Sequence, residues 1–241
     1  MHFLTGENGP RNMWLPHLQR LGWGRMFVRY LYEPYPGEPW GLDNGAYGCW
    51  LHGRAWDGDA YRRRVEKAAE LHGHSPAWLA VLPDVVADPG SLAFSLEWRE
   101  RLSGIPLPWF LAVQDGMTPE AVAPHLPGLT GLFLGGTDAF KASAATWADL
   151  ARGAGLRFHY ARAGTRRKLA AARAVGADSC DSTRPIRDRT EFRRFERLWT
   201  HGDPQLELFD HEEHRLAIRR DRLDGRPGVG IVRRSRNGTF R

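Results

Sequence analysis

Short apolar runs alternate with longer amphipathic segments along most of this 241-residue chain. Glycine, proline or aspartate bounds most of the runs, a pattern that is typical of buried parallel strands. Eight runs are strand candidates, at residues 2–5, 26–31, 40–42, 78–82, 109–113, 132–134, 156–160 and 177–180. Helical periodicity marks the segments between most of them, at residues 12–21, 60–71, 92–102, 140–151 and 166–174, and again after the last run, at 191–199.

Capping signals support several of these helices. Asp59 can cap the helix at 60–71, and Thr118-Pro119-Glu120 is a strong helix start. The link at residues 32–38 instead has two prolines and no room for a helix. Regular alternation of strand and helix predicts a parallel sheet with right-handed crossovers. We therefore expect an α/β fold, a closed (β/α)8 barrel of the TIM type that is irregular around strands one to three, and an open doubly wound sheet is the alternative.

Length and composition refine this picture. The barrel would occupy residues 1–200 as a catalytic domain, and the charged, glycine-rich residues 201–241 would form a basic, flexible tail. Two cysteines, Cys49 and Cys180, make neither a disulfide framework nor a cysteine-built zinc site, so we expect no metal. No Walker loop or dinucleotide fingerprint is present, and no cofactor is expected. No apolar run has the length of a membrane span and no signal segment stands at the start, so we expect a cytoplasmic protein.

Five of the predicted strands end in a polar or glycine position, and in barrel enzymes that edge holds the catalytic groups. Asp43 follows the third strand and Asp181 the eighth. Paired carboxylates can divide the chemistry at an anomeric carbon, one staying ionised as a nucleophile while the other, with a raised pKa, handles protons. The structural alternative is that such acids cap helices or pair with arginines.

Other residues at this edge are candidates for recognition. The carboxylate of Asp84 can accept two N–H bonds from a guanine-type edge, and the amide of Gln114 offers a donor and an acceptor. Gly135 and Gly136 would let the backbone approach a flat ligand closely, although a glycine pair is also typical of a plain tight turn. His159 and Arg162, near the end of the seventh strand, could face the ligand or pack. Trp50 and Trp56 follow Asp43, where a base could stack on them.

The net charge of +6 is unevenly distributed. Residues 161–200 hold eleven Arg or Lys against five Asp or Glu, and residues 211–241 hold nine Arg against four acids. This asymmetry favours a polyanionic partner for the C-terminal part, with solvated arginine-rich surfaces as the alternative.

Between about Gly41 and Arg184 the chain resembles the tRNA-guanine transglycosylase superfamily, and most closely its DpdA-like phage and bacterial members, which are DNA 7-deazaguanine transglycosylases. Six short blocks carry the resemblance in order: Leu42-Asp43-Asn44-Gly45-Ala46-Tyr47, Pro83-Asp84-Val85, Ala112-Val113-Gln114-Asp115-Gly116, Gly131-Leu132-Phe133-Leu134-Gly135-Gly136, Tyr160-Ala161-Arg162-Ala163-Gly164-Thr165 and Gly176-Ala177-Asp178-Ser179-Cys180-Asp181.

The resemblance implies a role for each block. Asp181 would be the nucleophile and Asp43 the second catalytic acid, with Asn44 as a small polar neighbour. The base-binding set would be Asp84, Gln114 and the backbone at Gly135-Gly136. Asp181 would then form a covalent glycosyl intermediate while guanine in DNA is exchanged for a 7-deazaguanine derivative, without a cofactor.

One departure bears on the substrate. The tRNA enzymes carry a cysteine-rich zinc motif after the nucleophile block, and no cysteine follows Cys180 here. This favours DNA over tRNA, with a free 7-deazaguanine base as the second substrate and host cytoplasm as the location if the protein is phage-encoded. The basic region would contact the nucleic-acid backbone, with Arg184, Arg187 and Arg189 as candidates. Alternatives are a hydrolytic nucleobase glycosidase, a tRNA-acting transglycosylase and a non-catalytic DNA- or clamp-binding barrel.

The tail contains one further motif, Gln205-Leu206-Glu207-Leu208-Phe209. It resembles the pentapeptide with which bacterial proteins dock on the replication sliding clamp, where Gln205, Leu206, Leu208 and Phe209 would be the anchors. The alternative is a tail that folds back onto the barrel through its apolar residues.

Overall fold

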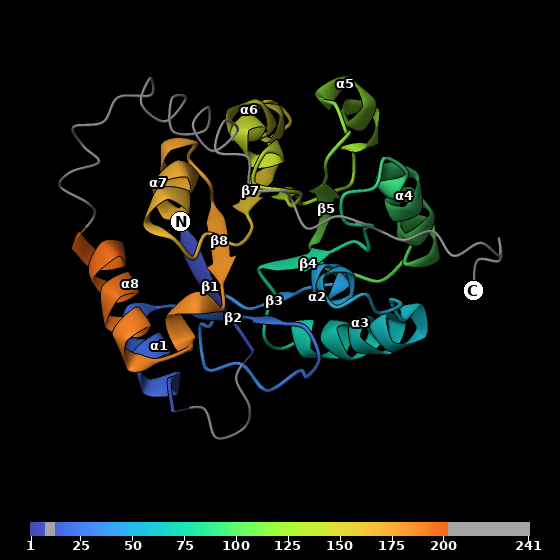
Figure 1. Cartoon of the computed structure of the whole chain (residues 1–241). Helices are drawn as coiled ribbons and strands as arrows, with labels where there is room; N and C mark the ends of the chain where they lie inside the picture. Colours follow the sequence, from blue (N-terminus) through green and yellow to red (C-terminus); the bar gives the residue numbers. More distant parts are fainter. Residues whose placement is uncertain (8–12, 202–241) are drawn as a thin grey trace. The chain divides into compact units, whose positions relative to one another are not determined.

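A closed eight-stranded barrel forms the centre of the protein. The computed structural model describes residues 1–7 and 13–201. In this part of the chain eight parallel strands pair in sequence order, and the last strand pairs with the first (Figure 1). The expected (β/α)8 barrel of the TIM type is therefore confirmed, and the open doubly wound sheet is wrong. The strands are β1 His2–Gly6, β2 Gly24–Phe27, β3 Gly41–Leu42, β4 Leu79–Val81, β5 Trp109–Val113, β6 Gly131–Leu134, β7 Arg157–Tyr160 and β8 Ser179–Ser182.

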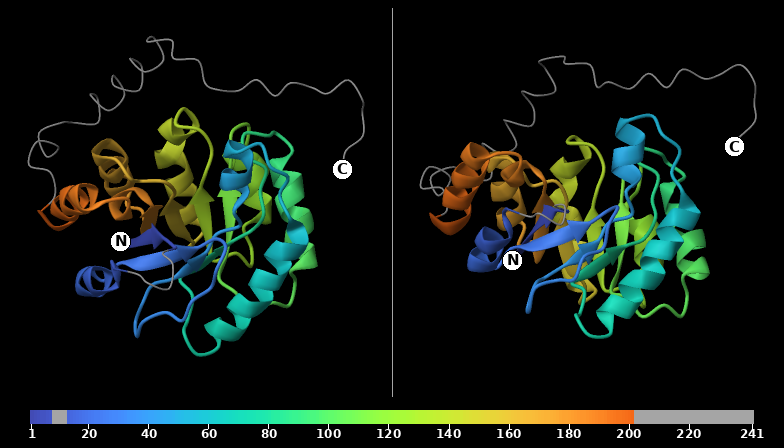
Figure 2. Two further views of the ribbon diagram at one scale, coloured as in Figure 1. Left: turned by 60° about the horizontal axis from the view of Figure 1, so that its bottom comes forward. Right: turned by 90° about the horizontal axis from the view of Figure 1, so that it is seen from below.

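Helices surround the strands, and α2 projects at one end of the barrel in the right-hand view of Figure 2. The helices are α1 Leu15–Leu21, α2 Ala46–Leu51, α3 Gly58–His72, α4 Ser91–Arg101, α5 Pro119–Val122, α6 Ala144–Gly153, α7 Arg166–Ala174 and α8 Arg189–His201, with short 3-10 turns η1 Ala123–His125, η2 Phe140–Ser143 and η3 Arg184–Ile186. No helix among the described residues is long and apolar enough to cross a membrane. The predicted tail and its clamp motif lie outside the described residues from position 202 onward.

Two strands differ from their predicted positions. β2 begins earlier than predicted and ends at Phe27, because the N–H groups of Val28, Arg29 and Tyr30 donate to the Glu7 carboxylate instead, at 2.8, 2.6 and 3.0 Å. β8 lies two residues later than predicted and includes Asp181. Its serines and aspartate have no apolar pattern, so the sequence signal marked only the beginning of this strand.

The wall between β2 and β3 is irregular, as expected. No helix lies between these two strands, and β3 has two residues. A buried ion pair fastens the proline-rich link instead: Arg25 Nε lies 2.6 Å from Glu38 Oε1, and Arg25 Nη2 lies 2.7 Å from Glu38 Oε2. Arg25 Nη2 also donates to the carbonyl of Glu33 at 3.0 Å. Two-point pairing of guanidinium and carboxylate therefore replaces helix packing at this wall.

Helix α3 begins two residues earlier than predicted, at Gly58. Asp57, rather than Asp59, caps α3, because its Oδ1 accepts from the N–H of Ala60 at 2.9 Å.

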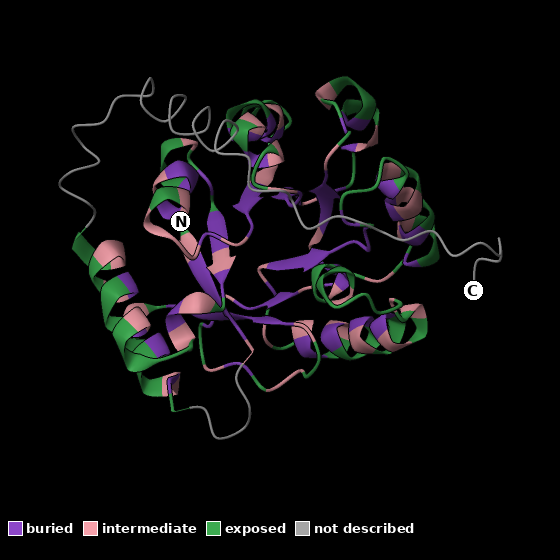
Figure 3. Cartoon of the chain, viewed as in Figure 1, coloured by how far each residue is buried: buried purple, intermediate pink, exposed green. Residues whose placement is uncertain are grey.

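The apolar core has two layers, and the strands between them are almost entirely buried (Figure 3). The larger layer joins the outer faces of the strands to the helices. A smaller layer fills the inside of the barrel and consists of Leu4, Met26, Leu79, Val81, Phe110, Ala112, Phe133 and Ala161. Gly131 makes room for Phe110, since a Cβ at that position would lie 2.2 Å from the ring. The packed interior leaves the carboxyl ends of the strands as the place for polar groups.

Candidate active site

The candidate residues come together at the carboxyl end of the barrel, called the mouth below. Asp43 follows β3, Asp84 follows β4 and Gln114 follows β5. Gly135 and Gly136 follow β6, Arg162 follows β7, and Asp181 lies on β8. Because all eight strands are parallel, their carboxyl ends open on the same side. The structure therefore brings both acids and the recognition candidates to one mouth.

Asp181 is held as a carboxylate. Its Oδ1 accepts from His159 Nε2 at 3.1 Å and from the backbone N–H of Arg162 at 2.9 Å. Burial alone would raise the pKa of Asp181, but these hydrogen bonds outweigh it and hold the pKa below its usual value. Among the described residues Oδ2 has no hydrogen-bond donor. This oxygen is the one free to react.

His159 lies behind Asp181 and is fully buried. Its ring stacks on Phe133, with centroids 4.6 Å apart and planes 5° from parallel, and its Nδ1 lies 2.8 Å from Ser179 Oγ. Burial lowers the pKa of His159, which favours the neutral ring. A neutral ring that donates from Nε2 to Asp181 must accept at Nδ1 from the Ser179 hydroxyl. His159 therefore contacts the predicted nucleophile, and whether it also faces the ligand stays a prediction.

Asp43 has the opposite electrostatic character. Its Oδ1 accepts from the N–H of Gly45 at 2.6 Å, and its side chain is partly exposed at the mouth. Burial raises the pKa of Asp43 to about 7 against that hydrogen bond, and the negative charges of Asp181 and Asp84 add to the rise. Asp43 can therefore gain and lose a proton near neutral pH, while Asp181 stays ionised.

Asp84, Asn44 and Gln114 form one buried network. Asn44 Nδ2 donates to Asp84 Oδ1 at 2.6 Å and to the carbonyl of Leu82 at 2.8 Å, and Gln114 Nε2 donates to Asp84 Oδ2. Burial raises the pKa of Asp84 to about 6 in spite of these donors. Gln114 Oε1 is buried and has no hydrogen-bond partner in the described part of the chain. An orphaned acceptor of this kind is costly unless a ligand supplies the missing N–H.

The two glycines have more specific roles than predicted. The N–H of Gly135 is already used, donating to the carbonyls of Val113 at 3.1 Å and Phe133 at 3.0 Å. A Cβ on Gly135 would lie 2.6 Å from Gln114 Nε2, so glycine is needed for the amide to fit. Gly136 has a φ of +69°, and its carbonyl accepts from Arg162 Nη2. Of this pair, the carbonyl of Gly136 is thus the group that meets a donor at the mouth.

Arg162 contacts both sides of the mouth. Its backbone N–H binds Asp181, and its φ of +59° is unusual for a residue with a side chain. Its guanidinium carbon lies 4.3 Å from the ring centroid of Tyr47, on the unpredicted helix α2. Arg162 therefore links the loop after Asp43 with the strand end beside Asp181.

The two tryptophans after Asp43 differ in their surroundings. Trp56 Nε1 donates to the carbonyl of Asn44 at 2.8 Å, and its ring packs edge-on against Trp98, with centroids 5.2 Å apart. It supports Asn44 of the Asp84 network, and its role as a stacking surface stays a prediction. Trp50 is 43% exposed and lies on α2 beside Tyr47, where stacking on a ligand remains a prediction.

Sequence reasoning missed Lys141, which follows β6 on η2 and is 5% exposed. Its Nζ donates to the carbonyl of Ala161, and it lies 4.8 Å from the ring centroid of Tyr160. Burial lowers the pKa of Lys141 well below its usual range, and the charge of Arg162 adds to this shift while Asp181 opposes it. A lysine in a chain whose cations are mostly arginine was the available signal.

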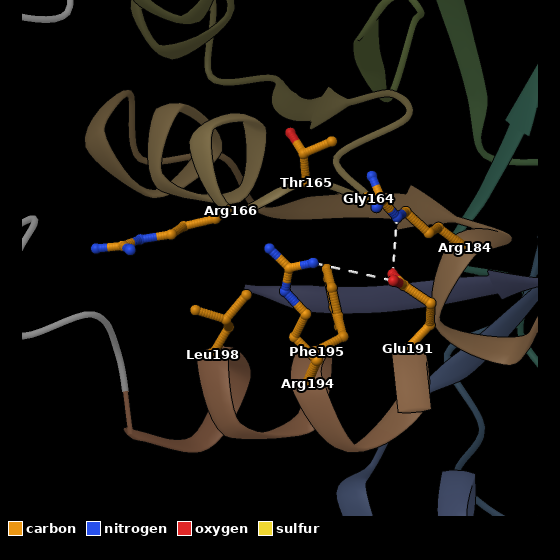
Figure 4. Close-up of a pocket in the computed structure, with 8 residues that line it drawn as sticks. All are labelled: Gly164, Thr165, Arg166, Arg184, Glu191, Arg194, Phe195 and Leu198. Atoms are coloured by element: carbon orange, nitrogen blue, oxygen red, sulfur yellow. Dashed lines mark hydrogen bonds and ion pairs between the residues drawn. The ribbon is translucent and has the colours of Figure 1, made fainter. Parts of the chain in front are cut away.

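The arginines predicted to bind nucleic acid lie just beyond β8. Arg187 and Arg189 are exposed. Arg184 is partly buried, and its Nε pairs with Glu191 Oε2 at 2.8 Å; Arg194 Nη1 reaches the other oxygen of Glu191 at 3.9 Å (Figure 4). Arg184 therefore has an internal partner, whereas Arg187 and Arg189 present their charge to solvent.

No group of three or more His, Cys, Asp or Glu side chains within residues 1–7 and 13–201 is placed to hold a metal ion. Comparison of the sequence with family models gives no match, and comparison with curated proteins gives no relative. The residues at the mouth are therefore the features of this chain that indicate a function.

Proposed function

We propose that this protein is a base-exchange enzyme, a pentosyltransferase that removes guanine from DNA and inserts a 7-deazaguanine base. One observation carries the proposal. Two carboxylates face the same mouth with their pKa values shifted in opposite directions, Asp181 downward and Asp43 upward to about 7. Such a separation supplies an ionised nucleophile and a proton-transferring partner at neutral pH.

In the first step Asp181 Oδ2 attacks C1′ of a deoxyguanosine turned out of the DNA helix. A bond forms between Oδ2 and C1′, and the bond between C1′ and N9 breaks, with its electron pair leaving on guanine. Protonated Asp43 supplies the proton that makes the departing guanine neutral. The products are a covalent glycosyl ester on Asp181, free guanine and ionised Asp43.

In the second step a 7-deazaguanine replaces guanine at the mouth. Asp43 removes the N9 proton, and N9 attacks C1′ while the ester bond to Asp181 breaks. The nucleophile returns as a carboxylate and Asp43 is again protonated, so no oxidant, reductant or net proton is consumed.

The buried network accounts for the choice of a guanine-type base. Asp84 presents carboxylate oxygens beside the unpartnered Gln114 Oε1, and the Gly136 carbonyl adds another acceptor. A surface rich in acceptors favours a heterocycle with several N–H donors, as guanine and 7-deazaguanine have.

The nucleic-acid backbone would contact the exposed cations beside β8. Arg187 and Arg189 follow the nucleophile within one short turn of chain and are not enclosed by protein. Replacing both by glutamine should weaken DNA binding uniformly across sequences and reduce the salt dependence of binding by about two phosphate contacts. An unchanged salt dependence would place the backbone contacts elsewhere.

Labelled 7-deazaguanine tests the proposal directly. Purified protein is incubated with the labelled base and either duplex DNA or tRNA, and incorporation of label is measured. We expect label in DNA and, after rapid denaturation, a covalent DNA adduct. Asp181→Asn should abolish the adduct, and Asp43→Asn should slow exchange by about 10²–10⁴-fold.

Each alternative has its own result in this assay. Guanine release without incorporation would mean hydrolysis, label in tRNA alone would mean a tRNA substrate, and DNA binding that survives replacement of both acids without any turnover would mean a binding protein. Normal exchange by Asp181→Asn would eliminate the proposed mechanism.

A further inference from the structure

We propose that the guanidinium group of Arg162 is a built-in occupant of the base site, which a base must displace before it can bind. The inference rests on the proposed function only for the identity of that base. Three contacts on opposite sides of the mouth support it, and none of them requires a bound ligand.

The first contact is with Tyr47. The guanidinium carbon lies 4.3 Å from the ring centroid, so the planar cation covers a face of the ring. Tyr47 is 37% exposed and lies on α2, four residues after Asp43. A partly exposed aromatic ring this close to a catalytic acid is where a base would stack. In this structure the Arg162 side chain takes that position.

The second contact is with Gly136. Arg162 Nη2 donates to its carbonyl, which follows β6 in a left-handed turn. The same side chain therefore stacks on a ring and uses an N–H in the plane of the stack. Guanine carries a guanidine fragment, made of N1, C2 and its amino group, and N3. That edge is flat, bears N–H donors and stacks, so the arginine and the base compete for the same partners.

The third contact fixes where the side chain begins. The backbone N–H of Arg162 binds Asp181 Oδ1 at 2.9 Å, and the φ of +59° holds this N–H toward the carboxylate. The side chain thus starts beside the nucleophile and reaches to α2 on the far side of the mouth. Rotation about its side-chain bonds would clear the mouth while the backbone contact with Asp181 stays in place.

When a base displaces the guanidinium, the stacking on Tyr47 and the hydrogen bond to Gly136 are lost. Free base should therefore bind more weakly than it would to the same site without the arginine side chain. The effect also selects ligands, since a planar molecule that stacks on Tyr47 but cannot donate to Gly136 does not replace both lost contacts. The class of ligand favoured is a flat heterocycle with an amidine or guanidine edge.

Substitutions at position 162 test the competition, with free guanine and 7-deazaguanine binding measured by calorimetry. Every substituted residue keeps the backbone N–H and the same left-handed φ. Arg162→Met retains length but can neither donate to Gly136 nor place a cation on the ring, and should bind the base about tenfold more tightly than the wild-type protein. Arg162→Lys should fall between them. Equal or weaker binding by Arg162→Met would overturn the proposal, because it would mean that the arginine holds the base in place.

A second experiment needs no assumption about the reaction. Methylguanidinium is added to Arg162→Ala, and the Tyr47 ring signals are followed by NMR. We expect saturable shifts of these signals in Arg162→Ala and none in the wild-type protein. The backbone amide signals around Gly136 should also shift in Arg162→Ala, and they should not shift in Arg162→Ala/Tyr47→Leu. If methylguanidinium did not bind Arg162→Ala saturably, the proposal that the Arg162 guanidinium occupies the base site would be overturned. If methylguanidinium bound saturably but no purine bound, the proposed base-exchange function would be contradicted. The proposal that the Arg162 guanidinium occupies a ligand site would still hold.

Discussion

His159 Nε2 lies 3.1 Å from Asp181 Oδ1, and the ring that makes this contact is completely buried between Phe133 and Ser179. Stacking on one side and a hydroxyl on the other leave the imidazole little freedom to turn. A neutral ring held in this way donates one directed hydrogen bond to the carboxylate. The orientation of the Asp181 carboxylate is therefore fixed by His159 from inside the barrel together with the backbone N–H of Arg162 at the mouth.

Removing that donor should shift the acidic limb of the pH–rate profile. Asp181 must be ionised to attack, and its pKa is lowered partly by His159. In His159→Phe, which keeps the stack on Phe133, the pKa should rise, and adduct formation should fall off roughly one pH unit higher than in the wild type. His159→Gln, whose amide can donate from a similar position, should largely restore the profile. If the acidic limbs of the pH–rate profiles of His159→Phe and the wild type coincided, the hydrogen bond from His159 to Asp181 would not lower the pKa of Asp181.

Asp43→Asn should stabilise the fold at alkaline pH. The pKa of Asp43 is about 7 in the folded protein and 3.8 in the reference state, so the wild type loses stability as the pH rises from about 4 to 7. The Asn variant keeps the acceptor for Gly45 without that ionisation. Chemical denaturation should give it an advantage of roughly 2–4 kcal/mol at pH 8 and little at pH 4.5. Asp59→Asn, an exposed acid on α3, is the control and should show no such pH-dependent gain.

Gln114→Met should weaken base binding more than turnover. The substitution keeps an unbranched side chain of similar volume but removes both the donor to Asp84 and the unpartnered oxygen. We expect KM for the free base to rise about tenfold, the loss of one to two hydrogen bonds, with a smaller change in kcat. Met117→Leu alters the buried sulfur beside the same backbone and should leave KM near the wild-type value. An unchanged KM in Gln114→Met would exclude this amide from the base site.

The ion pair in the helix-free wall should behave as a unit. Glu38→Ala leaves the Arg25 guanidinium buried without its carboxylate, since the two side chains are 5% and 0% exposed. We expect a loss of about 3–5 kcal/mol in the free energy of unfolding, measured with denaturant. The double variant Arg25→Met/Glu38→Leu should recover most of it, because no unpaired charge remains. A double variant as unstable as Glu38→Ala would show that packing, rather than charge, dominates there.

The fold was predictable because each strand is buried on both faces. The runs around Leu111 and Leu132 are apolar throughout, and the residue after each strand marks the carboxyl edge. That regularity alone put Asp43, Asp84 and Gln114 on one side of the barrel. The closed order of the strands then followed from uniform alternation with helices.

The missed features depend on partners far away in sequence. β2 ends where the Glu7 carboxylate accepts hydrogen bonds from three backbone N–H groups, and no local sequence signal at residues 28–30 predicts this end. Asp181 lies within β8 because its polar neighbours are satisfied inside the barrel, where Ser179 meets His159. The pairing of Arg162 with Tyr47 joins helix α2 to the end of β7, and only folding brings those two positions together.

The absence of a helix between β2 and β3 gives the two carboxylates proposed to be catalytic unequal mechanical support. Asp181 belongs to a four-residue strand paired on both edges, while Asp43 follows a two-residue strand, and a looped segment replaces the helix between β2 and β3. Thermal fluctuations should therefore be larger on the Asp43 side, so amide hydrogens there should exchange with solvent sooner. In the proposed reaction the departing and arriving bases would pass the more flexible Asp43 side of the barrel mouth. The sugar would stay bound to the more rigid Asp181 side.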